Sequence, residues 1–174
     1  SDAEPITITN CGQKVTLNKP ATRAVTLNQG ATEDVLAIGG ESKLAGTAYL
    51  DSEIPEKWKK AYNSVKVLSK KYPPKEIFLS AKPDLAVSSY SSAFTDKAVG
   101  TREELKKQGI ATYISPFECP KGTPSAEATW ENVWKEMAEV GTLIGSKDAA
   151  DKVIAEQRKS LKEITSNKHG SGTS

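Results

Sequence analysis

The stretch Arg23-Ala-Val-Thr-Leu-Asn-Gln-Gly-Ala-Thr-Glu-Asp-Val-Leu-Ala-Ile-Gly-Gly40 decides the fold of this chain. It predicts a short buried strand over residues 24–27, then a polar turn over 28–30. A helix is expected to begin near Ala31 and to end at the Gly39-Gly40 pair, because glycine is a frequent C-terminal stop. A strand that runs straight into a helix is the basic unit of an open α/β sheet.

The start of this helix has the residue types that favour a helix N-terminus. Asn28 and Thr32 are candidate capping or first-turn residues, and Glu33 and Asp34 place negative charge where the helix dipole favours it. The strand-to-helix turn leaves backbone N–H groups pointing over the end of the sheet, which is where parallel sheets bind ligands. An ordinary strand-turn-helix unit that binds nothing fits this stretch equally well.

The turn does not have the pattern of a nucleotide-binding loop. It contains one glycine, Gly30, and no lysine, so it matches neither a dinucleotide fingerprint nor a Walker loop. With 174 residues, of which 37% are hydrophobic, the chain is long enough for one well-buried α/β domain and too short for two.

Charge and hydropathy exclude two further classes. The 24 basic and 22 acidic residues are interspersed, which gives no support to nucleic-acid binding. No apolar run approaches the length needed to span a bilayer, and the first residues, Ser1-Asp2-Ala3-Glu4-Pro5, do not form a signal peptide. A secreted protein of this sequence would have lost its targeting segment.

The two cysteines and the single histidine give no metal or catalytic motif. Cys11 and Cys119 lie far apart in the chain, and His169 lies in a Gly/Ser-rich tail. Two alternatives remain for the cysteines: a pair of buried free thiols, or one disulfide. Their turn-like surroundings, Asn-Cys-Gly and Glu-Cys-Pro, favour the disulfide.

The rest of the chain alternates strands with helices. A hairpin is expected around Asn10-Cys11-Gly12, and further strands at 44–48, 64–68, 85–88 and 110–114, with short helices at 54–62, 75–81 and 101–108. The segment Thr101-Arg-Glu-Glu104 matches a capping box. Such alternation, with the hairpin and the two late helices, predicts an α/β fold with a mainly parallel five-stranded sheet, an N-terminal β-hairpin and a long C-terminal helix.

The last third of the sequence predicts two helices. Apolar residues recur at three- and four-residue steps over about 130–144 and again over 147–165. Residues 166–174 carry no structural signal and are expected to form a disordered tail. A long, charged helix followed by nothing suggests a connection to a part of the protein that is not present.

Five short motifs, in this order, resemble a known family. They are Arg23-Ala-Val-Thr-Leu-x-x-x-Ala-Thr-Glu33, Leu44-Ala-Gly-Thr-Ala-Tyr49, Glu76-Ile-Phe-Leu-Ser-Ala-Lys-Pro-Asp-Leu85, Leu105-Lys-Lys-Gln-Gly-Ile110 and the segment from Gly141 to Lys152. Together they are similar to the substrate-binding proteins of ABC importers for iron–siderophores, haem and cobalamin. Each motif is weak alone, but the resemblance spans about residues 15–165.

The resemblance implies two Rossmann-like lobes joined by one long rigid helix, with the ligand in the cleft between them. On that basis residues 1–145 correspond to the N-terminal substrate-binding lobe and residues 146–165 to the interlobe helix, with the second lobe absent, either by truncation or because the protein has one lobe. The ligand face would consist of the residues that follow the strands: Asn28, Gln29, Gly30, Ala31, Tyr49, Lys70, Ser89, Tyr90 and Ser91.

The residues at these positions suit a bulky metal chelate. Tyr49 and Tyr90 offer broad apolar faces with a polar tip, and Lys70 is the cation best placed for an anionic ligand. Arg23 precedes its strand and should lie at the wrong end of it. A ferric siderophore is therefore the first expectation, with cobalamin or haem as alternatives, and no resident cofactor or protein-bound metal is expected.

The resemblance also implies a partner and a location. Glu76 stands where a glutamate of cobalamin-binding relatives docks on arginines of the membrane permease, although a solvated helix charge is the simpler interpretation. The expected protein is an extracytoplasmic monomer, either a periplasmic protein or a cell-surface lipoprotein.

Two other classes of function are compared with transport. A chelatase-type enzyme needs a base and metal ligands such as histidine, and no histidine lies in the part expected to fold, so no enzymatic activity is expected. A surface adhesion or sensory module that uses the same fold is an open alternative.

Overall fold

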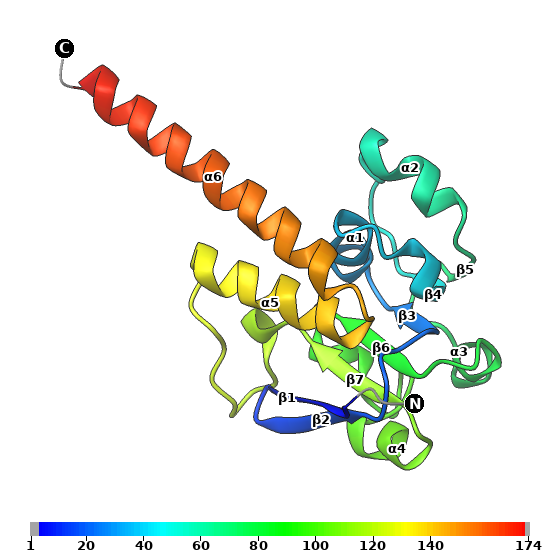
Figure 1. Cartoon of the computed structure of the whole chain (residues 1–174). Helices are drawn as coiled ribbons and strands as arrows, with labels where there is room; N and C mark the ends of the chain where they lie inside the picture. The colour runs from blue at the N-terminus through cyan, green and yellow to red at the C-terminus, as the bar shows by residue number, and fades with distance from the viewer. Residues whose placement is uncertain (1–3, 173–174) are drawn as a thin grey trace.

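The computed structural model describes residues 4–172, and the side chains of residues 4–167. Its centre is a five-stranded parallel sheet (Figure 1). The sheet contains β3 (Ala24–Thr26), β4 (Leu44–Ala48), β5 (Val67–Ser69), β6 (Leu85–Ser88) and β7 (Ala111–Ile114), in the order β5-β4-β3-β6-β7. Of these five strands, β3 comes first in sequence and lies at the centre, and the chain winds outward from it in both directions. The predicted fold class is confirmed.

Helices cover both faces of the sheet. They are α1 (Gln29–Ala37), α2 (Glu56–Asn63), α3 (Lys75–Ser80), α4 (Arg102–Lys107), α5 (Trp130–Leu143) and α6 (Lys147–Gly172), with short 3-10 turns η1 (Glu41–Lys43), η2 (Ser91–Ala93) and η3 (Pro116–Glu118). Thr101 caps α4 as predicted, since its hydroxyl accepts a hydrogen bond from the Glu104 amide at 3.1 Å.

Two hydrophobic cores lie on opposite faces of the sheet because successive strand residues point to opposite sides. In β6, Leu85 and Val87 join the core beneath α1 and α5, while Ala86 joins the core beneath α3 and α4. In β7, Tyr113 and Ile114 divide in the same way. Both faces are buried, which explains why these strands have no polar alternation in sequence.

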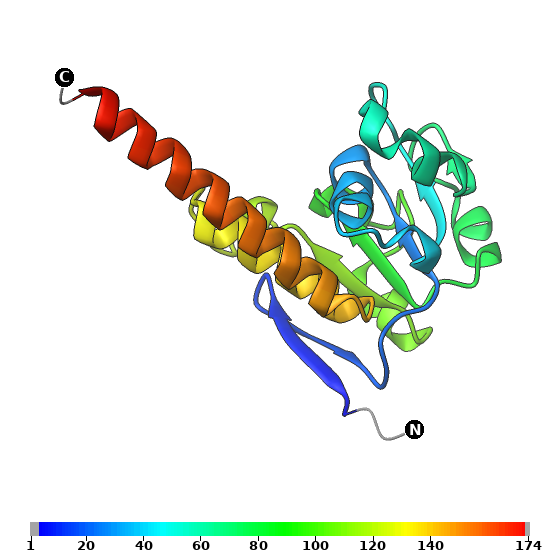
Figure 2. The same cartoon turned by 45° about the horizontal axis from the view of Figure 1, so that its top comes forward.

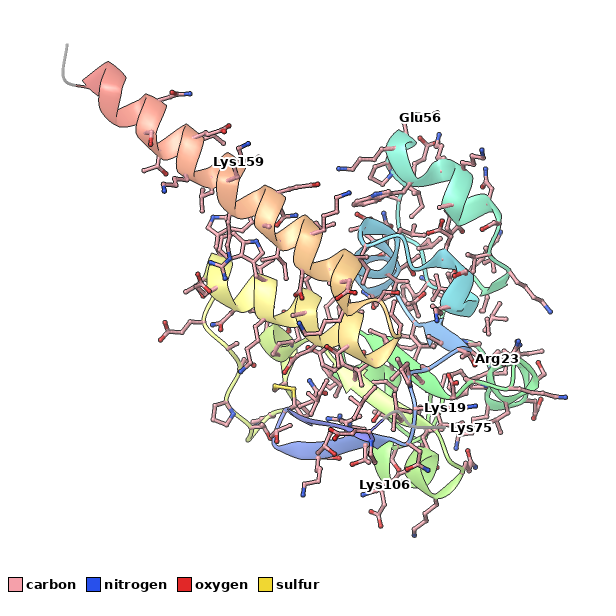
Figure 3. The ribbon with its side chains drawn as sticks, viewed as in Figure 1. Lys19, Arg23, Glu56, Lys75, Lys106 and Lys159 are labelled. Atoms are coloured by element: carbon pink, nitrogen blue, oxygen red, sulfur yellow. A yellow bond between two sulfur atoms is a disulfide. The ribbon has the colours of Figure 1, made fainter. Side chains whose placement is uncertain are left out.

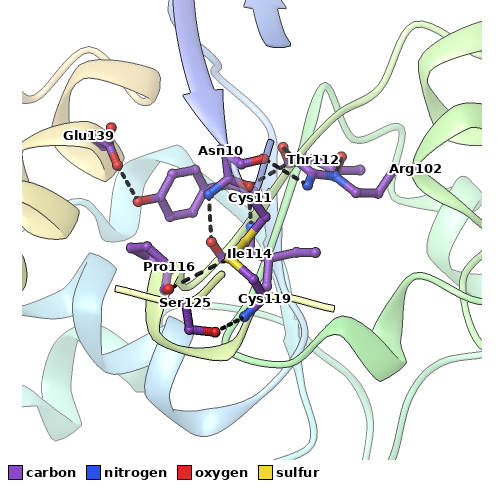
Figure 4. Close-up of a disulfide and its surroundings, with 10 residues drawn as sticks. Asn10, Cys11, Arg102, Thr112, Ile114, Pro116, Cys119, Ser125 and Glu139 are labelled. Carbon is purple, nitrogen blue, oxygen red and sulfur yellow. Dashed lines mark hydrogen bonds between the residues drawn. A yellow bond between two sulfur atoms is a disulfide. The ribbon is translucent and has the colours of Figure 1, made fainter. Parts of the chain in front are cut away.

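The N-terminal hairpin forms a two-stranded sheet of its own. Strands β1 (Ile6–Asn10) and β2 (Gln13–Leu17) pair antiparallel around Cys11 and Gly12, which both have positive φ, as a tight hairpin turn requires. A disulfide between Cys11 and Cys119, with Cα atoms 5.4 Å apart, ties this turn to the segment after β7 (Figure 4). Of the two alternatives for the cysteines, the structure has the disulfide.

Helix α6 is longer than predicted. It runs beside α5 and then extends beyond it, as both Figure 1 and Figure 2 show. The prediction that residues 166–174 form a disordered tail is wrong for 166–172, which continue the helix, and residues 173–174 lie outside the described part. Each residue added to an existing helix gains a backbone hydrogen bond without a new nucleation cost, and no proline interrupts this segment.

Helix α1 also differs from the prediction. It begins at Gln29, two residues before Ala31, so Glu33 and Asp34 lie in its second turn and not in its first. Asn28 occupies the N-cap position, but its side chain forms no cap hydrogen bond. The reason is that the Asn28 side chain is bonded to another strand, as described below. No helix among the described residues is both long and apolar enough to cross a membrane.

Candidate ligand-binding site

The carboxyl ends of parallel strands meet at one edge of the sheet, which we call the rim. In the observed strand order, the segments that follow β5, β4, β3 and β6 lie next to one another along the rim. The residues predicted as ligand contacts are the residues that follow these strands, so the fold brings Lys70, Tyr49, Asn28 and Ser89 to one edge in that order. Figure 1 shows this edge beneath the start of α1.

Asn28 is the structural centre of the rim. Its side chain is 6% exposed, and Oδ1 accepts a hydrogen bond from the Ser89 amide at 2.8 Å. Its backbone carbonyl accepts from both the amide and the hydroxyl of Thr32. Asn28 therefore joins the loops after β3 and β6 and starts α1, which limits the freedom of its side chain to reorient toward a ligand.

Gln29 fixes the loop that follows β4. Its Oε1 accepts from the amides of Asp51 and Ser52 at 3.0 and 2.8 Å, and its Nε2 donates to Glu33 Oε2 at 2.8 Å. Both polar ends of the side chain are used within the protein. Gln29 thus shapes the rim and has little capacity left for a direct ligand contact.

Gly30 and Ala31 contribute backbone only. A Cβ atom at Gly30 would lie 2.8 Å from Ser89 Oγ, so a larger residue here would force the Ser89 side chain to rotate away. Ala31 is 1% exposed and belongs to the core beneath α1. The methyl group of Ala31 thus packs in the core, so the prediction that Ala31 contacts a ligand could be met only by its backbone.

Aromatic side chains form the exposed part of the rim. The rings of Tyr49 and Tyr72 contact each other with centroids 4.9 Å apart, and Lys71 Nζ lies 4.9 Å from the Tyr49 ring centroid. Tyr90, after β6, is 50% exposed. This group offers flat apolar surface and a cation side by side, which suits a large planar or chelate ligand.

Tyr72 and Lys71 were not predicted as site residues. Tyr72 follows β5 by three residues, and its hydroxyl is hydrogen bonded to Ser92 Oγ at 2.6 Å across the rim. In the sequence, Tyr72 precedes the Pro73-Pro74 pair, which indicates a break between elements. For that reason Tyr72 was not assigned to the loop that follows β5 at the rim. The predicted cation Lys70 is exposed, and among the described residues it forms no ion pair.

The loop after β6 is held by hydroxyl contacts. Ser88 Oγ accepts from the Tyr90 amide at 3.0 Å and donates to the Tyr90 carbonyl at 2.8 Å. Ser89 packs against Gly30, and Ser91 begins η2. The exposed position of Tyr90 is therefore fixed by its backbone and not by contacts of its ring.

A group of acidic residues lies where α1 faces α5. Burial, followed by the charges of Glu136 and Glu33, raises the pKa of Asp34 well above its ordinary value. Burial also raises the pKa of Glu136, and its interaction with Ser115 partly offsets this. Burial and the neighbouring Glu139 raise the pKa of Tyr113, whose hydroxyl donates to Glu139 Oε1 at 2.7 Å.

We expect Asp34→Asn to raise the free energy of unfolding near pH 7 by about 1–2 kcal/mol. In the native state Asp34 binds its proton more tightly than in the unfolded chain, so stability falls as the pH rises above 3.8, the ordinary aspartate value, through the raised pKa. The gain in stability should therefore vanish below pH 3.8.

Urea unfolding of wild type and variant near pH 7 and below pH 3.8 measures this gain, and the exposed Glu156→Gln variant is the control. An equal gain at the two pH values would contradict the prediction.

Among the described residues, no group of three or more His, Cys, Asp or Glu side chains is arranged to hold a metal ion. The groups that the rim exposes are aromatic rings, hydroxyls and lysines.

A parallel sheet with β3 at its centre, helices on both faces and a polar, aromatic rim at the strand carboxyl ends define a Rossmann-like α/β fold. The chain belongs to the periplasmic binding protein family, whose sequence profile matches residues 25–170. This confirms the family suggested by the five motifs and implies a location outside the cytoplasm. Among curated proteins, none matches the chain.

Solved structures have the same fold. A periplasmic binding protein from Veillonella parvula superposes with a TM-score of 0.79 and 30% identity over 95% of this chain and 54% of its own. An ABC-type Fe3+-hydroxamate transport protein from Saccharomonospora viridis gives 0.70 and 24%, over 90% of this chain and 54% of its own. The catecholate-siderophore binding protein VctP of Vibrio cholerae gives 0.67 and 18%, over 97% and 56%. The chain thus spans about half the length of these proteins.

Proposed function

We propose that this chain is part of the solute-binding component of an ABC importer, which captures a ferric siderophore and delivers it to a membrane permease. The observation that supports this most is the rim, where Tyr49, Tyr72 and Tyr90 lie near Lys70 and Lys71 in a member of the periplasmic binding protein family. Rings and lysines together suit an anionic chelate with a large organic shell.

The proposal extends to the organisation of the whole protein. Residues 1–145 would form the first lobe and α6 would lead to a second lobe, which would close over the rim from the opposite side. A single lobe buries one side of a ligand, so the 174-residue chain should bind more weakly than a two-lobed protein. The proposed protein acts as a monomeric, non-enzymatic carrier, in the periplasm or as a cell-surface lipoprotein.

Titration of the chain with a panel of ferric hydroxamates, ferric catecholates, haem and cobalamin tests the ligand class. We expect saturable quenching of intrinsic fluorescence by a ferric siderophore, and a loss of about tenfold in affinity in Tyr49→Ala and in Tyr90→Ala, because each ring contributes exposed apolar contact area. Saturable binding of haem or cobalamin alone would favour the alternative ligands of the same fold. Unchanged affinity in both tyrosine variants would show that the ligand does not bind at the rim.

Glu76 is proposed to dock on the permease. It lies in the first turn of α3, is exposed and, among the described side chains, forms no ion pair. Such a carboxylate is free to pair with an arginine of a partner and to steer association.

We expect Glu76→Arg to reduce ligand uptake by cells by tenfold or more, because it replaces attraction to the permease by repulsion and weakens that interface by about 1–3 kcal/mol. The affinity of the protein for its ligand should stay unchanged. The matched control is Glu163→Arg, the same charge change at an exposed position of α6. Equal uptake in the two variants would contradict the proposal that Glu76 docks on the permease. Ligand binding without any uptake in cells would instead favour a sensory or adhesive surface protein.

A further inference from the structure

The edge of the sheet opposite the rim has a distinct charge pattern. The amino-terminal ends of the five parallel strands meet there, and basic residues precede these strands. Arg23, Lys43 and Lys66 come directly before β3, β4 and β5, and Lys82 comes three residues before β6. With Lys19 before β3 and Lys106 before β7, these residues form what we call the basic edge.

The cations of the basic edge are accessible. Five of the six side chains are exposed and Lys43 is half-buried. Figure 3 shows Lys19, Arg23 and Lys106 on one side of the molecule, with Lys159 and Glu56 far from them. The basic edge thus gathers cations that are scattered over almost ninety positions of the sequence.

These cations are not neutralised within the protein. Among the described residues, none of the six has a carboxylate within 4.0 Å. The Arg23 guanidinium donates to the Ala81 carbonyl at 3.0 and 2.7 Å, which fixes its position and leaves its charge uncompensated.

The same edge has few carboxylates, and most of these are hydrogen bonded, ion-paired or partly buried. Asp84 accepts hydrogen bonds from the amides of Thr22 and Arg23 at 2.9 and 3.0 Å, so its charge is directed to the backbone. Glu103 and Asp151 pair with Lys107 and Lys147, and these pairs cancel in charge. Glu41 of η1 is partly buried. Asp148, at the start of α6, is exposed near Pro20, but it is one carboxylate against the six cations of the basic edge, so the edge as a whole is positive.

The formal net charge of +2 conceals this polarity. Carboxylates that balance the basic edge lie on other parts of the molecule, such as the exposed Asp51 and Glu53 in the loop that follows β4 at the rim. A protein with separated charge of this kind orients in the field of a charged surface even when its net charge is small.

The shape of the basic edge indicates the kind of partner. Neighbouring strands lie about 4.8 Å apart, so five strands set these loops along a row of roughly 20 Å. A row of this length fits an extended anionic surface better than one small anion. The cations are mostly lysines, which act as point charges and lack the bidentate geometry that suits base or phosphate recognition by arginine.

We infer that the basic edge is an electrostatic docking surface for an anionic phospholipid bilayer. Lysines near such a bilayer are attracted by its negative surface potential, and the attraction extends over about one Debye length. In this orientation the rim, at the opposite edge of the sheet, faces away from the lipid and stays open to solutes. The inference does not depend on the ligand proposed above.

The test is co-sedimentation of the chain with vesicles of phosphatidylglycerol, with vesicles of phosphatidylcholine for comparison. We expect binding to the anionic vesicles alone, and its loss as salt shortens the Debye length from about 10 Å at 0.1 M to about 3 Å at 1 M. The variant Lys19→Gln/Lys66→Gln/Lys82→Gln should lower the partition coefficient roughly 100-fold, since each lysine contributes about fivefold.

The matched control removes three exposed lysines from α6 in the variant Lys152→Gln/Lys159→Gln/Lys162→Gln. It has the same net charge and should keep wild-type binding, and circular dichroism checks that both variants fold. No binding to phosphatidylglycerol, or equal loss in the two variants, would overturn the inference. Binding to heparin without binding to vesicles would also overturn it, because the partner would then be a soluble polyanion.

Discussion

Replacement of Cys11 and Cys119 together by serine is expected to lower the free energy of unfolding by about 3–5 kcal/mol. The disulfide closes a loop between residues 108 positions apart, so it removes many conformations from the unfolded chain. It also joins the hairpin, which forms its own two-stranded sheet, to the segment after β7.

Urea unfolding followed by circular dichroism measures this effect. The oxidised wild type is compared with the double serine variant, and the difference should disappear when both are unfolded in the presence of a reductant. A difference below about 1 kcal/mol under oxidising conditions would mean that contacts other than the disulfide hold the hairpin in place.

Substitution of Arg102 by methionine is expected to cost about 2–4 kcal/mol of stability. Arg102 is 8% exposed, and its guanidinium donates four hydrogen bonds: to Asn10 O and Oδ1 at 3.1 and 2.8 Å, and to Thr112 Oγ1 and O at 2.9 and 3.1 Å. Figure 4 shows these contacts beside the disulfide. Methionine fills similar space but leaves buried acceptors without donors, which is the main cost.

Burial of the arginine opposes part of this cost. It lowers the pKa of Arg102 to about 10, which reflects the loss of hydration of the charged group. The Arg102→Lys variant keeps the charge but cannot supply the planar set of donors, so it should be less stable than wild type as well. If Arg102→Met were as stable as wild type in urea, the hydrogen bonds and the desolvation cost would cancel.

Much of the fold could be predicted because its signals are local. Strands β4 and β6 and the hairpin around Cys11 and Gly12 follow from short apolar runs and turn residues. Thr101 and Glu104 predict the start of α4 from neighbouring positions. In each case the residues that determine the structure lie within a few positions of one another.

The structure differs from the sequence predictions where a residue's contacts are made with residues distant in sequence. Asn28 does not cap α1 because its side chain accepts a hydrogen bond from Ser89, 61 residues later. Asp34 looked like a favourable helix charge, but the sequence does not show that it is buried near Glu136 of another helix. The side chain of Ala31 points into the core because α1 begins two residues earlier than expected.

The sequence predicts which residues lie near the candidate site, but it does not predict the contacts between them. The sequence indicates that Tyr49, Ser89 and Tyr90 follow strands, and parallel topology then places them on one edge. The contact of Tyr72 with Tyr49 depends on the pairing of β4 with β5, which no local pattern reveals. Local sequence therefore gives the residues near the rim, and the strand order gives their contacts.

The most direct test of the proposed function maps the ligand onto the chain by nuclear magnetic resonance. The 15N-labelled protein is titrated with a ferric hydroxamate and, as a diamagnetic control, with the matching gallium complex. Unpaired electrons of the bound Fe3+ broaden the resonances of nearby amides, so the amides of Gly30, Tyr49, Lys71 and Tyr90 should broaden first with iron and stay sharp with gallium. Broadening centred on another surface, or none at saturating chelate, would contradict the proposal that the rim binds a ferric siderophore.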